Sequence, residues 1–484
     1  MRRWMFFTQA DCVTIGTQVM REVRMFDEKL LNKAEALYIR CRLDEAFPLF
    51  MELAGAGCGR AMYFLGEYYN HGLGSIKDRS ETEARYWHGK GAAVGELLSQ
   101  LNLAYMEDPR SEERAVLCRG YFPSVVKAAE AGDIVAADEL GDMYLYGFGV
   151  EKSGKQAVFW LEKGVEKGYW RSLNALGDMY RLGEEVEEDG KKALSLYRKA
   201  EEMHSREALT SIGFMYYAGQ GVDFDEGKAF SYFRKAAGAG DLDALFMMGR
   251  CYMEGSAVEK DDRKAADCFK ETADRGYPMG MWALGQSYLH GIGVQRDEKK
   301  AVALYQKAAG MNLAAAYSAL AQCYRYGAGV TEDKAAAVEM YKQAFALGQG
   351  LAADEIGTMY LVGNEILPNV AEAFRWYEKG AEMEEAASWY HLGICYAEGL
   401  GTEINRDKAL EYLYRAYAAE YPGALEYITD NMQIRLQEGN CSSSEERFYY
   451  GERWSRTEQI KKVPPGQEET VFYRYPQNIS ITGK

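Results

Sequence analysis

A short motif that returns every 36 residues is the feature that most constrains the fold of this chain. In each copy a Leu, Ile or Met precedes a small residue, and a Tyr follows three positions after the small residue. A period of this length is typical of an array of two-helix units. Two upstream copies, Leu65-Gly66-Tyr69 and Leu101-Asn102-Tyr105, precede a three-residue insertion. Eight consecutive copies then keep the spacing: Leu140-Gly141-Tyr144, Leu176-Gly177-Tyr180, Ile212-Gly213-Tyr216, Met248-Gly249-Tyr252, Leu284-Gly285-Tyr288, Leu320-Ala321-Tyr324, Ile356-Gly357-Tyr360 and Leu392-Gly393-Tyr396.

The spacing inside the motif predicts two helices per repeat. Ala136, Leu140 and Tyr144 recur at helical intervals. Gly141 shares their face, so we expect a neighbouring helix to approach it closely. A glycine such as Gly147 predicts the turn that follows, because glycine adopts positive φ at little cost. A Ser, Asp or Asn twelve residues after each small residue predicts the N-cap of the second helix. These residues are Ser153, Asp189, Asp225, Asp261, Asp297, Asp333, Asn369 and Asn405.

A single helical hairpin cannot bury its own apolar face, so we expect each repeat to be stabilised mainly by its two neighbours. The predicted fold class is therefore all-α, a right-handed α/α superhelical solenoid of 36-residue helix-turn-helix repeats. The assembled pattern resembles the Sel-like repeat, a relative of the tetratricopeptide repeat with a longer loop. Asp225-Glu226-Gly227-Lys228-Ala229, with Tyr232 and Ala236-Ala237, carries this resemblance in a nearly complete copy.

The departures from the repeat predict the domain organisation. Residues 26–60 resemble a tetratricopeptide hairpin and are expected to cap the array, which covers 61–420 in about ten repeats. Residues 96–135 keep little of the motif and predict a degenerate repeat. We expect 421–437 to form a C-terminal capping helix. Residues 1–25 and 438–484 lie outside the repeats and are predicted to be a flexible N-terminal segment and a tail.

Charge and hydropathy exclude several classes of function. The formal net charge of −16 argues against nucleic acid as a partner, because phosphate binding requires a basic surface. No stretch reaches 18 consecutive apolar residues, so membrane insertion is not expected. The first residues also lack a secretory apolar run. We therefore predict a cytoplasmic bacterial protein. Its oligomeric state does not follow from the sequence.

The family resemblance implies a non-catalytic scaffold or adaptor that binds a protein or peptide partner. By analogy with tetratricopeptide arrays, the first helices line a concave groove, and four positions around each small residue face it. Aromatic and arginine side chains there suit a peptide, since they bury much area with few rotatable bonds. Inter-repeat packing is the alternative role, above all for Phe246 and Trp282. The predicted groove residues are Phe214, Tyr217, Phe246, Arg250, Trp282, Gln286, His290, Gln322, Arg325 and Tyr326. Nearer the N-terminus, Asp138 and Asn174 occupy the same positions, on what we expect to be a solvated face.

Candidate catalytic and metal-binding residues are few. The five histidines form no HxxxH motif and have no evident carboxylate partner, so the sequence predicts no metal site, no cofactor and no catalytic triad. One Ser-x-x-Lys, from Ser124 to Lys127, leaves open a β-lactam-binding or hydrolytic enzyme, an activity linked to some relatives of the family. Its usual Lys-Thr-Gly companion is absent. A secreted effector, or the neutralising partner of one, is a further alternative.

Overall fold

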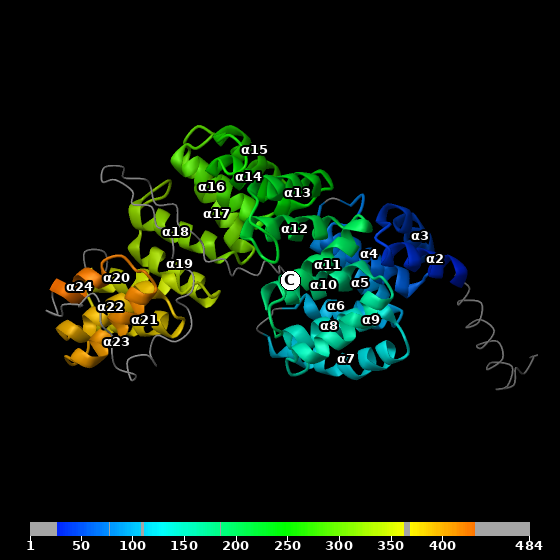
Figure 1. Cartoon of the computed structure of the whole chain (residues 1–484), viewed down its shortest axis with the longest axis horizontal. Coiled ribbons are helices and arrows are strands. Elements are labelled where there is room, and N and C mark those ends of the chain that lie inside the picture. Colours follow the sequence, from blue (N-terminus) through cyan, green and yellow to red (C-terminus); the bar gives the residue numbers. More distant parts are fainter. Residues whose placement is uncertain (1–26, 77, 108–110, 184, 363–367, 431–484) are drawn as a thin grey trace, which may run out of the picture. The chain divides into compact units, whose positions relative to one another are not determined.

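The computed structural model describes residues 27–76, 78–107, 111–183, 185–362 and 368–430, and the regular structure of these residues is entirely helical (Figure 1). The helices are α2 (Glu28–Ile39), α3 (Leu43–Gly55), α4 (Gly59–His71), α5 (Glu81–Ala93), α6 (Leu97–Tyr105), α7 (Glu112–Glu130), α8 (Ile134–Tyr146), α9 (Gly154–Glu166), α10 (Trp170–Leu182), α11 (Gly190–Glu202), α12 (Arg206–Ala218), α13 (Glu226–Gly238), α14 (Leu242–Glu254), α15 (Asp262–Asp274), α16 (Pro278–His290), α17 (Glu298–Gly310), α18 (Ala314–Tyr326), α19 (Lys334–Ala346), α20 (Leu351–Val362), α21 (Val370–Glu382), α22 (Ala386–Glu398), α23 (Arg406–Ala418) and α24 (Ala424–Asp430).

These helices form tandem hairpins, which confirms the predicted all-α repeat solenoid. The even-numbered helices from α4 to α22 are the first helices of the repeats, and each odd-numbered helix that follows is the second. The chain divides into two compact units, Met1–Met340 and Tyr341–Lys484. The predicted N-terminal segment 1–25, the tail 438–484 and residues 431–437 of the predicted capping helix lie outside the described residues.

The small residue of each motif is the contact point within the hairpin. A Cβ atom added to Gly177 would lie 2.5 Å from the ring of Tyr197, and one added to Gly285 would lie 2.4 Å from the ring of Tyr305. Both rings are fully buried. The glycines are therefore required by the close approach of the second helix, as the sequence predicted.

The predicted caps and turns are also present. Asp225 accepts a hydrogen bond from the backbone N–H of Lys228 at 2.8 Å, and Ser153, Asp189, Asp261, Asp297, Asp333, Asn369 and Asn405 cap their helices in the same way. Gly147 ends α8 with a φ of 75°. The Lys228 side chain then turns back over the ring of Tyr216, 5.1 Å from its centroid. One Asp-x-x-Lys thus caps the second helix through its Asp and contacts the first helix through its Lys.

The repeat over 96–135 is irregular in length. Its first helix, α6, has 9 residues, and its second helix, α7, has 19, whereas the helices of neighbouring hairpins have 13. Its last turn nevertheless returns to the common register. The N–H of Asp133 donates to the carbonyl of Ala128, and 36 residues later the N–H of Tyr169 donates to the carbonyl of Gly164.

Candidate functional site

Contacts between the first helices of successive repeats join α4 to α6 and α10 to α12 in the first unit, and α20 to α22 in the second. We use the name inner wall for the surface of the first helices in each unit, the face predicted to be concave. All ten predicted groove residues lie on α12, α14, α16 and α18 of the first unit. His290 and Tyr326 are exposed, and the others except Phe246 are half-buried.

Phe246 belongs to the core instead. Its side chain is 5% exposed and packs against the rings of Phe269 and Tyr277, at centroid distances of 5.6 and 6.0 Å. The position three residues before the motif glycine faces the second helix of its own hairpin and the residue before α16, so core packing takes this side chain. We therefore leave Phe246 out of the candidate surface. Trp282, at the same position one repeat later, is half-buried.

A polar cluster joins two repeats on this wall. Arg250 donates to Glu254 Oε1 at 2.8 Å, and the hydroxyl of Tyr217, from the preceding first helix, lies 3.5 Å from Glu254 Oε2. Sequence reasoning omitted Glu254, although it holds the repeat position of His290 and Tyr326. The signal was present in the register, but an acidic residue did not match the expected aromatic and arginine pattern.

The next part of the wall has little charge. The sequence of α16 contains no Asp, Glu, Lys or Arg, and that of α18 contains only Arg325. Gln286 and Gln322 hold the same position in consecutive repeats, with Trp282 one turn before the first and Tyr326 one turn after the second. Tyr326 is 67% exposed, and the Arg325 guanidinium lies 5.3 Å from its ring centroid. This arrangement offers amide donors and acceptors one helical turn from aromatic side chains, which suits binding to a polypeptide.

Upstream, the equivalent positions are covered. Asp138 and Asn174, expected on a solvated face, are 4% and 8% exposed. Asp138 accepts from the hydroxyl of Ser172 at 2.5 Å, Asn174 donates to Ser205 at 2.9 Å, and α4 contacts both α8 and α10. Glu67 of α4 accepts from Arg171 of α10 at 2.6 Å, and the hydroxyl of Tyr63 donates to Glu139 of α8 at 3.1 Å.

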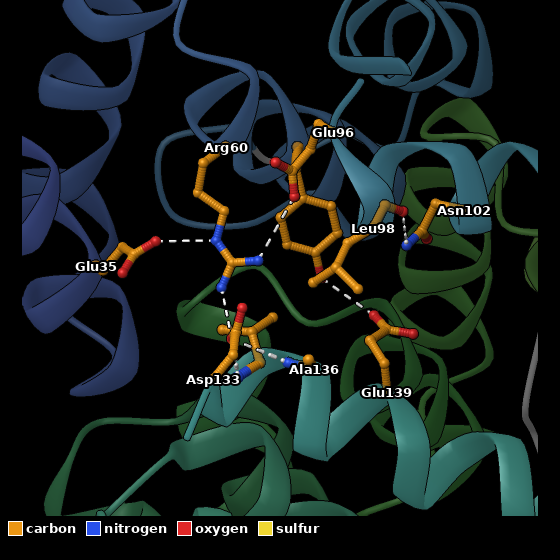
Figure 2. Close-up of polar contacts among 10 residues, drawn as sticks. Glu35, Arg60, Glu96, Leu98, Asn102, Asp133, Ala136 and Glu139 are labelled. Carbon is orange, nitrogen blue, oxygen red and sulfur yellow. Dashed lines mark hydrogen bonds and ion pairs between the residues drawn. The ribbon is translucent and has the colours of Figure 1, made fainter. Parts of the chain in front are cut away.

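A second set of ion pairs holds the N-terminal hairpin to the same region (Figure 2). Arg60 lies among three carboxylates: Glu35 of α2 at 2.9 Å, Glu96 before α6 at 3.6 Å, and Asp133 before α8 at 2.8 Å. Asp133 also caps α8 by accepting from the N–H groups of Val135 and Ala136. The Arg60 guanidinium therefore links α4, which carries it, to α2 and to the starts of α6 and α8.

Aromatic packing follows the same path. Tyr38 of α2 is fully buried, and its ring centroid lies 4.6 Å from that of Phe64 and 6.3 Å from that of Trp170. Residues more than 130 positions apart thus share one core. The expectation that each repeat depends mainly on its two neighbours is wrong for this part of the chain. Helix α4 directly contacts the third repeat (α8 and α9), and both α2 and α4 contact the fourth (α10 and α11).

The histidines also differ from expectation. His71 and His88 both face Glu67, with Nε2 atoms 3.5 and 3.6 Å from its carboxylate oxygens. In the second unit, His391 Nδ1 lies 2.7 Å from Asp354. Sequence reasoning missed these pairs because their members are on different helices or sit four residues apart as Glu-x-x-x-His. No group of three or more His, Cys, Asp or Glu in the described ranges is arranged to hold a metal ion.

Electrostatics around Glu67 are set by burial and by Arg171. Burial raises the pKa of Glu67, but Arg171 and the two imidazoles outweigh it and hold the pKa well below its ordinary value. Burial lowers the pKa of His88 to about 4. Burial also raises the pKa of Asp138 to about 7, against the effect of Arg171. At neutral pH, Glu67 is ionised and His88 is neutral.

The Ser-x-x-Lys at Ser124 has a structural explanation. The shared hydrogen-bond register places Ser124 and Lys127 where the next repeats have Trp160 and Lys163, then Leu196 and Lys199. The lysine is therefore a recurrent residue of the second helix. Both Ser124 and Lys127 are exposed, so the pair lacks the enclosed surroundings that activate a nucleophile.

Within the described part of the chain, no helix combines the length and the apolar character needed to cross a bilayer. The tandem hairpins define a helical repeat protein. The family model of the Sel1 repeat matches nine segments, which together exceed half of the chain: 59–96, 134–169, 170–205, 206–241, 242–277, 278–313, 314–349, 350–384 and 386–421. The chain belongs to the Sel1 repeat family, as its sequence motif indicated.

Two solved structures illustrate the likeness. A Sel1 repeat protein from Oxalobacter formigenes is 26% identical over 69% of this chain and 93% of its own, with a TM-score of 0.44. A protective antigen of uropathogenic Escherichia coli with an SLR fold is 24% identical over 81% and 84%, with a TM-score of 0.43. Proteins of this family generally act as scaffolds for protein interaction.

Proposed function

We propose that this protein is a non-catalytic scaffold that binds a partner protein along the inner wall of α12, α14, α16 and α18, and that it works in the bacterial cytoplasm. The observation that carries the proposal is the change in the wall along the array. The chain's own helices cover it at α8 and α10, whereas on α16 and α18 aromatic and amide side chains recur with Arg325 as the one Asp, Glu, Lys or Arg in the two helices.

The expected partner segment follows from this chemistry. Gln286 and Gln322 can each donate to and accept from a main chain, while Trp282 and Tyr326 offer apolar area at low entropic cost. A partner segment with few charged side chains fits this surface best, because the wall offers little to offset the desolvation of a buried charge. The alternative of a secreted effector, or of its neutralising partner, stays a prediction.

Photo-crosslinking tests the surface directly. A photoreactive phenylalanine analogue placed at Gln286 or Gln322 should capture the partner, and the same residue at Lys270 or Ala303 should not. These control positions are exposed on the second helices α15 and α17. Equal capture from both sets of positions would show that the inner wall is not the binding surface.

Binding measurements with the captured partner then test the anchors. Trp282→Ala should weaken binding by roughly thirtyfold, since a central aromatic anchor contributes about 2 kcal/mol. Gln286→Ala should have a smaller effect, and Lys270→Ala should have none. Circular dichroism melting of each variant separates lost binding from lost folding. Unchanged affinity in Trp282→Ala and Gln286→Ala, with the fold intact, would overturn the proposal.

A further inference from the structure

Two residues at the connection between α4 and α5, His71 and Asp78, contact repeats that lie far along the chain. Arg206, the first residue of α12, donates from Nη2 to the carbonyl oxygen of His71 at 3.0 Å. Arg275, which follows α15, donates from Nε to Asp78 Oδ1 at 2.9 Å. These contacts join residues 135 and 197 positions apart. Arg206 therefore binds the end of α4, and Arg275 binds Asp78 shortly before α5.

Neither arginine fits the repeat pattern. The positions equivalent to Arg206 in α8, α10, α14, α16 and α18 hold Ile134, Trp170, Leu242, Pro278 and Ala314. The position of Arg275 is occupied by Met203, Ala239 and Met311 in nearby repeats, and by a cation only in the earlier repeat with Lys167. Packing of the repeats therefore does not require a cation at either place, which indicates a separate role.

Both arginines are largely buried and donate to distant turns of the chain. The side chains of Arg206 and Arg275 are only 14% and 16% exposed, although both groups are charged. His71 ends α4, so its carbonyl lies at the negative end of that helix dipole, where a cation is favoured. Arg275 also donates from Nη2 to the carbonyl of Gly240 at 3.0 Å, which ties the turn between α13 and α14 into the same contact. One guanidinium therefore connects three separate turns of the chain.

The contacts nearby differ in how easily they can release. Glu67 and Arg171 form a buried ion pair, in which the carboxylate is 1% exposed. The carboxylate of Asp78, in contrast, is 68% exposed and open to salt ions. Exposed pairs are weak and are screened by salt, whereas buried pairs resist it. The Glu67–Arg171 pair is therefore expected to stay formed when the Asp78–Arg275 pair breaks.

We propose that Arg206 and Arg275 form a clasp, which we define as their contacts with His71 and Asp78. The clasp ties the α4–α5 segment to α12 and to the turn between α15 and α16, and it opens reversibly at Asp78. Opening separates Asp78 from the turn between α15 and α16, while α4 stays on α10 through Glu67 and Arg171 and on α12 through His71 and Arg206. Because that turn leads into α16, which carries part of the inner wall, the clasp sets the position of α16. The clasp itself does not depend on the proposed binding function.

Hydrogen exchange of the full chain, measured by mass spectrometry without a partner, tests the clasp. Raising the salt concentration from 20 to 500 mM should speed exchange about two- to fivefold in peptides covering 72–80 and 275–281, the range expected for losing one exposed ion pair. Peptides within α4 should not change. Salt-independent exchange at 72–80 would contradict the proposal.

Charge exchange between the two partners gives the decisive comparison. Asp78→Arg alone should open the segment at low salt through repulsion from Arg275, and Arg275→Asp alone should do the same. The double variant with both changes should recover part of the protection, since the ion pair is restored but the bond to Gly240 is not. The control exchange, Arg250→Glu with Glu254→Arg, involves a local pair and should leave 72–80 unchanged. A double variant as open as the single variants, with normal helix content, would show that the ion pair does not hold the segment.

Discussion

Individual side chains in the first unit show how burial changes the importance of an ion pair. Glu67 and Arg171 lie almost out of solvent, whereas Glu254 and Arg250 form a pair that is more than a third exposed. Both pairs have short N–O distances. They should differ in their contribution to stability, because a buried charge that loses its partner has no water to replace it.

Replacing Glu67 with Gln tests this difference. We expect Glu67→Gln to lower the free energy of unfolding by about 3 kcal/mol, since Arg171 is left without its main partner. The loss should be near the lower end of the range for such changes because Asp138 Oδ2 lies 3.7 Å from Arg171. The matched change Glu254→Gln should alter stability by less than about 1 kcal/mol. Urea unfolding followed by circular dichroism measures both, and equal effects would contradict the assigned role of burial.

His88 gives the same region a dependence on pH. Its side chain is fully buried, and its ring packs on Gly66, where an added Cβ would lie only 2.4 Å away. The folded pKa of about 4 is below the ordinary value of 6.5, so the contribution of His88 to stability is complete above pH 6.5 and is lost as the pH falls toward 4.

The ring of Phe has a similar shape and does not titrate. We therefore expect His88→Phe to gain stability relative to the natural chain as the pH falls from 6.5 to 4, by up to about 3 kcal/mol. Thermal melting at pH 7.5, 6.0 and 4.5 measures this difference, and His204→Phe, at an exposed position, serves as the control. A stability difference that does not change with pH would show that His88 titrates normally in the folded chain.

At the level of the helix, the hairpin depends on a glycine that faces a fixed ring. Tyr197 cannot move away from Gly177, because its hydroxyl donates to Asp178 at 2.7 Å and its ring is fully buried. Several other repeats have the same arrangement, with a Tyr or Phe ring over the motif glycine.

Adding one methyl group at this contact should separate the two helices. We expect Gly177→Ala to cost about 1–3 kcal/mol through overpacking, despite the better helix propensity of Ala. Gly120→Ala in α7 is the matched change, since nothing lies within 4 Å of its added Cβ, and it should stabilise by about 0.5–1 kcal/mol. Urea unfolding of the two variants should therefore shift in opposite directions. A stable Gly177→Ala protein would mean that the hairpin tolerates a wider spacing.

Sequence reasoning succeeded at this level because the determinants are local. The spacing of Gly177, Tyr180 and Asp189 defines the two helices, their contact and the cap between them. It could not place Phe246, because a rotation of a few tens of degrees decides whether that position faces the wall or the packed core. It also could not pair Glu67 with Arg171. Such a pair depends on the accumulated rotation of several repeats, which no single repeat encodes.

For the molecule as a whole, contacts between distant repeats change how stability is distributed. A solenoid held only by neighbouring contacts frays from its ends, and damage to one repeat stays local. In the first unit, Tyr38 packs on Trp170 and Arg60 binds Asp133. The N-terminal hairpins therefore share their stability with the third and fourth repeats.

Removing one ring tests this coupling. Tyr38→Ala should cost about 3–5 kcal/mol and should speed hydrogen exchange in α10 as well as in α2. Tyr305→Ala removes an equally buried ring that packs within its own hairpin, so its effect on exchange should centre on α16 and α17. If α10 keeps its protection in Tyr38→Ala, the N-terminal hairpins are only an independent cap.

The pairing of Glu67 with Arg171 also restricts how such a chain can grow. Duplication or loss of a whole 36-residue copy between α5 and α10 would move Arg171 by one repeat along the array. Glu67 and Arg171 would then each lose their partner. Copies added beyond α16 would disturb none of these pairs. Recombination is therefore free to vary the length of the downstream array, while the upstream copy number is fixed by the distance that a guanidinium can reach.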